Sequence, residues 1–246
     1  MKKRTHTPPA PVADTYPMRI NKYLAHKGAS TRAGADELIS QGKVLINGTR
    51  AKLGDKVMEA DIVEVLGTRK KKLLVYFAYN KPQGVVSTNP QGDEKGIMES
   101  ISLPIKCFPV GRLDKESHGL LILTNDGRVT DRLLNPIHKH EKEYRVEVDR
   151  KFTPGFLANM QRGVELSDGM TAPAKIKAVS ENVFTLTLTE GRNRQIRRMT
   201  EKLGYTVRDL ERVRIQNILL GKLAPNATRE ITDEEKETFL KSIGLE

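Results

Sequence analysis

The sequence is poor in cysteine and has no long apolar run. Among its 246 residues the one cysteine, Cys107, can form no internal disulfide and has no second thiol with which to share a metal ion. A lone thiol suits a reducing compartment, and this side chain is expected to pack in a core. No apolar stretch approaches the ~20 residues that cross a bilayer, and the basic first residues continue into prolines rather than an apolar signal core. These absences predict a soluble, cytoplasmic protein.

Acidic residues are outnumbered by basic ones. The chain has 31 Asp and Glu against 42 Lys and Arg, which gives a net charge of +11 and a pI of about 9.7. A basic excess in a moderately apolar chain indicates a polyanionic partner, and nucleic acid is favoured over a membrane surface. At about 100 to 200 residues per domain, the length predicts two units.

The first quarter of the sequence predicts a tail and a small unit. Residues 1–16 are basic and proline-rich, which predicts a flexible tail. Apolar residues at helical spacing then predict two short helices, the first ended by Gly28 and the second capped by Thr31. Short strands around the turn Asn47-Gly48 follow. Residues 17–66 therefore form a complete small unit, and residues 67–73 form a basic linker.

Residues 74–246 alternate between strand and helix patterns. Apolar or alternating runs predict strands at 73–79, 120–123, 142–149, 174–178, 183–188 and 207–215. Helical spacing predicts helices that begin near 129, 154, 194 and 233. Asn193 is the predicted cap of the third helix, and Thr232 with Glu235 is predicted to form a capping box at the last. Periodicity alone predicts a mixed α and β unit.

Two dense polar stretches stand out in this second unit, at 111–119 and 190–199. The first places Arg112 and Asp114 in a loop before a buried strand, and loops on a rigid scaffold often carry chemistry. Taken alone, the two residues equally suit a solvated ion pair or a turn cap. The second stretch has four arginines within seven residues at a helix start, where they repel one another unless an anion is near. A solvated basic patch would also account for it.

The small unit resembles the S4 RNA-binding module across its whole length. The resemblance is carried by Met18-Arg19-Ile20, Ser30-Thr31-Arg32, Gly42-Lys43-Val44 and Gly54-Asp55-Lys56. It implies that Arg19, Lys22, Arg32 and Lys43 face RNA and neutralise phosphates rather than read bases. The second helix departs from the pattern, because Ala33-Gly34 replaces an arginine and a glutamate. This departure implies a reduced affinity for RNA.

With the second unit included, the chain resembles RNA pseudouridine synthases of the RsuA family over residues 17–240. The blocks that carry this resemblance are Asn80-Lys81-Pro82-x-Gly84, Gly111-Arg112-Leu113-Asp114 continuing to Asp126-Gly127, Lys142-Glu143-Tyr144-Arg145-Val146, and Gly191-x-Asn193-Arg194-Gln195-Ile196-Arg197-Arg198-Met199. Within the family, the chain is most similar to members that act on large-subunit ribosomal RNA.

The resemblance implies an α+β fold in which an S4 module precedes a catalytic domain. That domain would have a mixed, mainly antiparallel sheet flanked by helices, with the active cleft between two halves of the sheet. It further implies that Asp114 is the nucleophile, Tyr144 the active-site tyrosine and Arg197 the partner of Asp114, with Ile196 beneath the base. No metal or cofactor is implied.

The resemblance also implies the residues that hold the RNA. Arg112 would fill the place of a flipped uridine or hold a phosphate, and Asn193, Arg194 and Lys81 would bind substrate. Arg192 and Arg198 would contact RNA more widely. The resemblance implies a monomer whose partner is ribosomal RNA, either free or in a partly assembled subunit. Small-subunit ribosomal RNA and tRNA are the alternative substrates.

Two functions of other classes remain open from the residues alone. A noncatalytic ribosome-assembly protein would explain the charge and the S4 module, but it would not require Asp114, Tyr144 and Arg197 together. A carboxylate-based glycosidase usually needs two carboxylates, and only Asp114 stands in a motif.

Overall fold

The computed structural model describes residues 16–67, 73–88 and 90–245. The chain divides into two compact units, Met1–Lys72 and Leu73–Glu246. The predicted tail, apart from Tyr16, and most of the predicted linker lie outside the described residues. Within the described part, no helix is long and apolar enough to cross a membrane.

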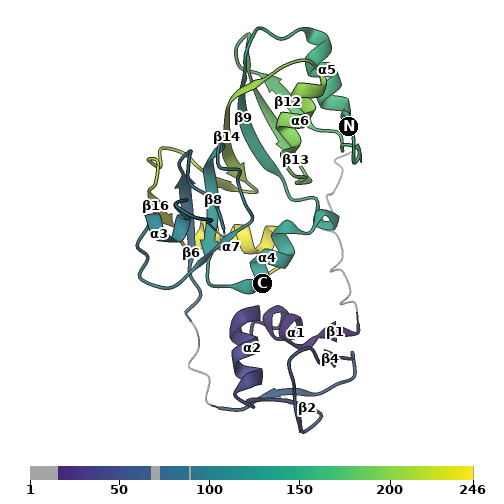
Figure 1. The fold of residues 1–246 in the computed structure, drawn as a ribbon, viewed down its shortest axis with the longest axis vertical. Helices are drawn as coiled ribbons and strands as arrows, with labels where there is room; N and C mark the ends of the chain where they lie inside the picture. The colour runs from purple at the N-terminus through teal and green to yellow at the C-terminus, as the bar shows by residue number, and fades with distance from the viewer. Residues whose placement is uncertain (1–15, 68–72, 89, 246) are drawn as a thin grey trace. The chain divides into compact units, whose positions relative to one another are not determined.

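The first unit packs two helices on short strands (Figure 1). Its elements are β1 (Met18–Arg19), α1 (Ile20–His26), α2 (Arg32–Ser40), β2 (Val44–Ile46), β3 (Thr49–Arg50), β4 (Lys56–Val57) and β5 (Val63–Val65). The predicted cap is confirmed, since the Thr31 hydroxyl accepts a hydrogen bond from the Gly34 amide at 3.1 Å. A Cβ on Gly34 would lie 2.4 Å from the Ser30 hydroxyl, so glycine fits here although it weakens the helix.

The second unit is built on one nine-stranded sheet in the order β12-β13-β9-β14-β8-β6-β16, with β15 on β14 and β7 on β8. Its strands are β6 (Tyr76–Lys81), β7 (Phe108–Val110), β8 (His118–Thr124), β9 (Lys142–Val148), β12 (Lys175–Ala178), β13 (Val183–Leu188), β14 (Val207–Ile215), β15 (Ile218–Leu219) and β16 (Thr228–Glu230), and a separate hairpin joins β10 (Glu165–Leu166) to β11 (Gly169–Met170). The helices are α3 (Ile97–Ser100), α4 (Gly127–Leu134), the 3-10 turn Pro136–His138, α5 (Pro154–Arg162), α6 (Gln195–Lys202) and α7 (Asp233–Ser242). The expected α+β fold is confirmed.

Strands β8 and β14 form the one parallel pair among the described strands of this sheet, and they join its two halves. The pairing is short and brings Gly119 opposite Arg212. Gly119 has a φ of +102°, and a Cβ there would lie 2.5 Å from the Arg212 carbonyl oxygen. Glycine is therefore required where the two halves meet.

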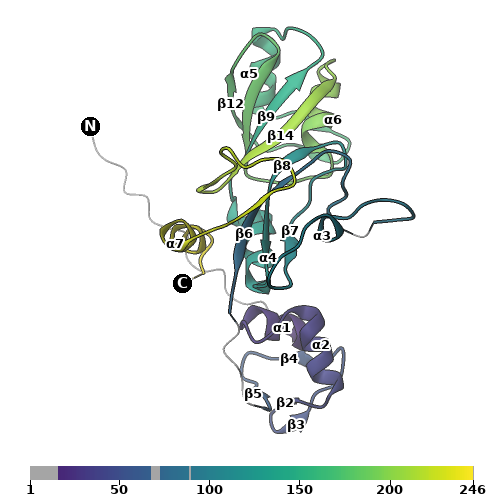
Figure 2. The ribbon, with the colours of Figure 1, turned by 90° about the vertical axis from the view of Figure 1, so that its left-hand side faces the viewer.

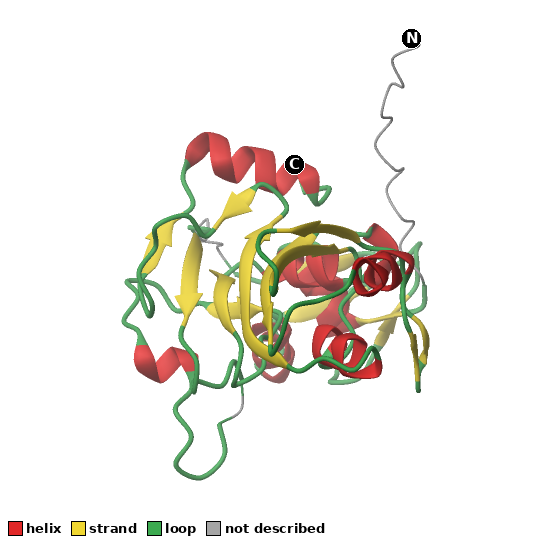
Figure 3. Cartoon of the chain, turned by 90° about the horizontal axis from the view of Figure 1, so that it is seen from above, coloured by secondary structure: helices red, strands yellow, loops and turns green. Residues whose placement is uncertain are grey.

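Each half of the sheet has its own helices and core. Helices α5 and α6 pack on β9, β13 and β14 through a cluster centred on Phe156, Phe184 and Met199. In the other half, α4 and α7 cover one face of β6 and β8, and α3 lies against the opposite face (Figure 2). From above, helices lie outside the strands on both sides (Figure 3). Burial on both faces explains the unbroken apolar runs of β6 and β8.

Two predicted helix caps are wrong. Helix α6 begins one residue later than expected, with Arg194 rather than Asn193 at its N-cap and a φ of 47° there. The Gln195 side chain accepts from the Arg192 amide at 3.1 Å instead. Thr232 precedes α7, but its side chain forms no cap bond, and Glu235 pairs with Arg229 at 2.6 Å. At α6 the Gln195 side chain accepts a bond near the helix start, and at α7 the expected capping-box partner Glu235 is engaged with Arg229.

Candidate active site

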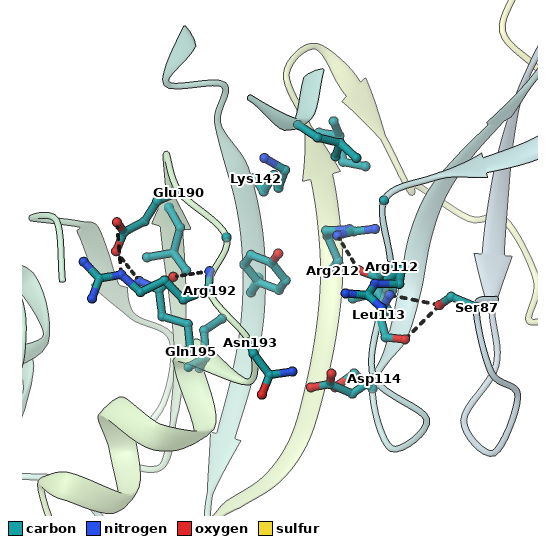
Figure 4. A pocket seen from close by; sticks show the side chains of 18 of the residues that line it. Ser87, Arg112, Leu113, Asp114, Lys142, Glu190, Arg192, Asn193, Gln195 and Arg212 are labelled. Carbon is teal, nitrogen blue, oxygen red and sulfur yellow. Dashed lines mark hydrogen bonds and ion pairs between the residues drawn. The ribbon is translucent and has the colours of Figure 1, made fainter. Parts of the chain in front are cut away.

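A pocket with a cavity volume of about 490 Å³ lies between the two halves of the sheet. It is lined by the loop after β7, the start of β9, the segment between β13 and α6, and residues of β14 (Figure 4). This is the position that the family resemblance implied for the cleft. The volume falls within the range of pockets that hold small molecules, so it suits a single nucleotide.

Hydrogen bonds hold the loop that carries Asp114 to the segment that contains Gly84 and Ser87. The Ser87 hydroxyl donates to the Leu113 carbonyl at 2.8 Å and accepts from the Leu113 amide at 3.0 Å. The Gly84 amide donates to the Lys115 carbonyl at 2.8 Å, and the Ser117 amide donates to the Asp114 carbonyl at 3.0 Å. These backbone bonds hold Asp114 at one place relative to the sheet.

Two buried cations lie behind this loop. The Lys81 ammonium is fully buried and donates to the Ser117 carbonyl at 2.7 Å and to the Pro82 carbonyl at 2.9 Å. Burial lowers the pKa of Lys81 to about 8, and the nearby charge of Asp114 opposes that shift. Arg212 is 4% exposed and donates to the Leu120 carbonyl at 2.7 Å. The charge of Lys81 therefore interacts favourably with that of Asp114.

The start of α6 faces the same loop from the other side. Arg194 donates to Glu116 at 2.9 Å and lies 3.9 Å from the Asp114 carboxylate. Arg197 donates to the Ser117 hydroxyl at 3.2 Å. The hydrogen bond from Arg194 lowers the pKa of Glu116, which therefore stays ionised in this cluster. The two arginines thus connect the halves of the sheet at the loop that carries Asp114.

Tyr144 and Ile196 give the pocket its apolar surface. Tyr144 pairs with Arg212 across β9 and β14, lines the pocket and packs against clusters from both halves. Ile196 is 4% exposed and lines the pocket from the first turn of α6. A carboxylate, an aromatic ring and an aliphatic side chain therefore share one cavity. This combination can hold a flat base with its sugar near the carboxylate.

Comparison with known proteins agrees with this arrangement. The RNA pseudouridylate synthase family matches residues 75–202, and the S4 domain matches residues 18–63. The chain belongs to the RNA pseudouridine synthases. Like the RsuA-family members that its motifs resemble, this synthase combines both domains. The noncatalytic and glycosidase alternatives are therefore set aside.

Relatives extend over most of the synthase. It is 42% identical over 230 residues to the dual-specificity RNA pseudouridine synthase RluF of Escherichia coli K12, a match that spans 92% of this chain and 79% of that protein. It is 37% identical over 227 residues to the ribosomal large subunit pseudouridine synthase B of Bacillus subtilis, across 88% and 93% of the two chains. A crystal structure of a pseudouridylate synthase superposes with a TM-score of 0.68 at 30% identity, covering 92% and 99%.

The structure brings most of the predicted pocket residues together. Asp114, Tyr144 and Ile196 line one pocket with three of the residues expected to bind substrate, namely Arg112, Asn193 and Arg194. In Figure 4, Asn193 and Asp114 point toward one another across the pocket. In the S4 unit, Arg19, Arg32 and Lys43 are exposed and Lys22 is half-exposed, as an RNA-facing role requires.

Two pocket predictions need correction. Lys81 does not line the pocket, because its fully buried ammonium is engaged with backbone carbonyls behind the loop. The expected ion pair between Arg197 and Asp114 is also wrong. The carboxylate within 4.0 Å of Arg197 is Glu116, and the cation within that distance of Asp114 is Arg194. Arg197 instead contacts the loop that carries Asp114 through its hydrogen bond to the Ser117 hydroxyl.

Arg192 and Arg198 are occupied by the protein rather than free for RNA. Arg192 donates to the carbonyls of Gly169 and Met170 at 2.9 and 2.6 Å. Arg198 forms a bidentate pair with Asp168 at 2.9 and 3.1 Å. The hairpin of β10 and β11 offers these acceptors, so it neutralises part of the basic patch.

Sequence reasoning missed three residues around the pocket: Ser87, Lys142 and Arg212. Lys142 had a readable signal, because it lies two residues before Tyr144 in a strand and so shares its face. Ser87 and Arg212 lie far along the chain from the loop they hold. Their positions depend on strand pairing, which no local pattern predicts.

Proposed function

We propose that this synthase converts a specific uridine of large-subunit ribosomal RNA to pseudouridine, in the cytoplasm. One relative is named for the large ribosomal subunit, and the net charge of +11 suits a polyanionic substrate. The observation that carries the proposal is Asp114, a carboxylate on a fastened loop in a pocket that it shares with Tyr144 and Arg194.

The reaction rearranges one nucleotide and needs no other reactant. The bond between uracil N1 and ribose C1′ breaks, the base turns over, and a bond from C5 to the same C1′ forms. C5 loses its hydrogen as a proton and N1 gains one, so atoms and electrons balance. Asp114 supplies the carboxylate that assists this exchange, by attack on the sugar or on the base.

Two cations lie near the Asp114 carboxylate. Arg194 lies 3.9 Å from it, and the buried Lys81 ammonium interacts with its charge. Both attract the negative charge on which the proposed attack depends.

The base is held between Tyr144 and Ile196 in this proposal. Tyr144 stacks on uracil, and its hydroxyl is placed for proton transfer. Because the bond to be broken lies within RNA structure, the uridine must be flipped out of its stack. The exposed Arg112, two residues before Asp114, fills the vacated place or holds a phosphate.

The deciding experiment is Asp114→Asn. The amide keeps the shape of the carboxylate but carries no charge and is a very poor nucleophile. The variant is expected to fold, to bind RNA and to form no pseudouridine. Tritium release from RNA labelled at uridine C5 measures this directly, since formation of the new bond expels that hydrogen.

The target is identified by mapping pseudouridines in ribosomal RNA and tRNA from cells with and without this gene. Loss of one modification in large-subunit RNA is expected. Near-normal tritium release by Asp114→Asn would remove Asp114 from the mechanism. A missing modification only in another RNA would overturn the substrate assignment and leave the chemistry intact.

A further inference from the structure

A lysine that the chemistry above does not use projects into the pocket. Lys142 begins β9, two residues before Tyr144, so both side chains leave the same face of the strand. It is half-buried and lines the pocket at some distance from Asp114 (Figure 4). At ~3.4 Å per residue, Lys142 lies ~7 Å along the strand from Tyr144.

Lys142 and Arg212 share this part of the pocket as two cations. Arg212 lies opposite Tyr144 on β14, whereas Lys142 lies opposite Ile215, and the register shifts between Arg212 and Arg214. Both side chains nevertheless line the pocket. Burial, followed by the nearby charge of Arg212, lowers the pKa of Lys142 to about 8. Two like charges therefore face one space in the unliganded protein.

Neither cation has an acidic partner among the described residues. Arg212 donates from Nε to the Leu120 carbonyl, and its buried Nη2 has no hydrogen-bond partner. For Lys142, the part of the chain that the structure describes provides no hydrogen-bond acceptor or ion pair, whereas Lys81 is satisfied by two carbonyls. Arg212 also donates from Nη1 to the Arg112 carbonyl at 3.5 Å, so its unsatisfied atom is Nη2 alone. Cations that are desolvated and face one another in a pocket are typical of binding sites.

The carboxylates of the pocket are engaged elsewhere. Asp114 lies by Arg194, and Glu190 accepts from the Gln195 amide at 2.6 Å and the Ala172 backbone at 3.0 Å. Two acidic residues, Asp114 and Glu190, line the pocket together with six basic ones, namely Arg112, Lys115, Lys142, Arg192, Arg194 and Arg212. The pocket lining therefore carries an excess of positive charge, to which Lys142 and Arg212 contribute.

We propose that Lys142, supported by the charge of Arg212, binds a backbone phosphate adjoining the flipped uridine. A uracil carbonyl could also accept from Lys142, but it would leave the repulsion between the two cations in place, whereas an anion removes it. If the base stacks on Tyr144, a phosphate of the same nucleotide reaches Lys142, the next residue on that face of β9. This inference rests on the proposed function, because it takes RNA as the ligand.

The test removes the charge from each partner in turn. Single-turnover conversion is measured on the RNA stem-loop that carries the mapped uridine, with a neutral methylphosphonate placed 5′ or 3′ of that uridine. For the unmodified protein, one of the two linkages is expected to raise the half-saturating concentration about tenfold or more. In Lys142→Met the natural RNA binds equally weakly, and the neutral linkage causes no further loss.

Lys115→Met is the matched control, because Lys115 also lines the pocket but pairs with Glu94 at 3.0 Å. In Lys115→Met the neutral linkage is expected to lower RNA affinity by the same factor as in the unmodified protein, so the two losses of affinity multiply. Lys142→Arg should recover part of the affinity, since it keeps the charge, and it serves if Lys142→Met fails to fold.

Two results would overturn the phosphate subsite. In the first, the neutral linkage at either position lowers the RNA affinity of Lys142→Met as much as it lowers that of the unmodified protein. In the second, the unmodified protein binds both neutral RNAs with full affinity. Either result would leave conversion of natural RNA intact. Failure of the proposed function looks different, because the unmodified protein would then form no pseudouridine in any RNA.

Discussion

Asp126 shows how a single buried charge anchors the second unit. Its carboxylate is 2% exposed and accepts from the Tyr76 hydroxyl at 2.8 Å and from Arg128 at 2.8 and 2.9 Å. Burial alone would raise the pKa of Asp126, but the hydrogen bonds from Arg128 and Tyr76 outweigh it, so the pKa is lowered. A lowered pKa means that the ionised form stabilises the fold above the ordinary value of 3.8, and this stability is lost as pH falls.

Asp126→Asn is therefore expected to lower the free energy of unfolding by about 2–3 kcal/mol at pH 7. The gap from the unmodified protein should narrow at pH 3.5, where the carboxyl becomes protonated in the unfolded chain. Urea unfolding followed by circular dichroism at both pH values measures this. Asp233→Asn on the exposed first turn of α7 is the control and should change stability by about 0.5 kcal/mol or less. An equal gap at both pH values would contradict the linkage.

Arg197 and Arg198 are adjacent on α6 and allow a second comparison at this scale. Arg197 holds the nucleophile loop through Ser117, whereas Arg198 pairs with Asp168 on the separate hairpin. Arg197→Ala is expected to lower kcat about 100-fold with little change in RNA affinity, because a small displacement of the nucleophile is enough to do so. Arg198→Ala should retain kcat within a few-fold. Steady-state kinetics with direct RNA binding separates the two; equal, purely affinity-type effects would indicate a general basic patch.

At the scale of elements, the parallel contact between β8 and β14 fixes the distance between the walls of the pocket. Gly119→Ala would place a methyl group 2.5 Å from the Arg212 carbonyl, so the strands must move apart. Gly169 has a similar φ of +98° but no atom within 4 Å of the added Cβ. Alanine at Gly169 thus measures the backbone strain alone.

We expect Gly119→Ala to destabilise the protein by at least about 2 kcal/mol more than Gly169→Ala. Activity of the folded fraction should also fall, because the Asp114 loop ends next to this contact. Thermal unfolding and tritium release measure the two effects. Similar losses for both variants would show that the contact adapts.

At the scale of the whole molecule, the S4 unit is expected to supply affinity and not chemistry. It contributes exposed basic residues, and every residue of the candidate pocket belongs to the second unit. A chain that begins at residue 73 should bind RNA more weakly and with a smaller dependence on salt, because fewer phosphates are neutralised. Slow conversion should remain at saturating RNA. Complete loss of turnover in a folded truncated protein would contradict this division of roles.

Most elements of this synthase and the reaction class are predictable from its sequence. Strand and helix periods, the cap Thr31 and the helix-ending Gly28 depend on residues a few positions apart, so a local window of sequence predicts them. The motif around Asp114 and the alternation through Tyr144 identified the central residues of the pocket for the same reason.

Which charged side chains lie next to one another depends on the tertiary structure. Arg194 rather than Arg197 lies by Asp114, Lys81 turns behind the loop, and Arg212 enters from a strand 98 residues after Asp114 in the sequence. These contacts follow from the order of strands in the sheet and from the short parallel pairing at Gly119. Which strands pair depends on burial and shape across the whole unit. A window of local sequence therefore does not predict the pairing.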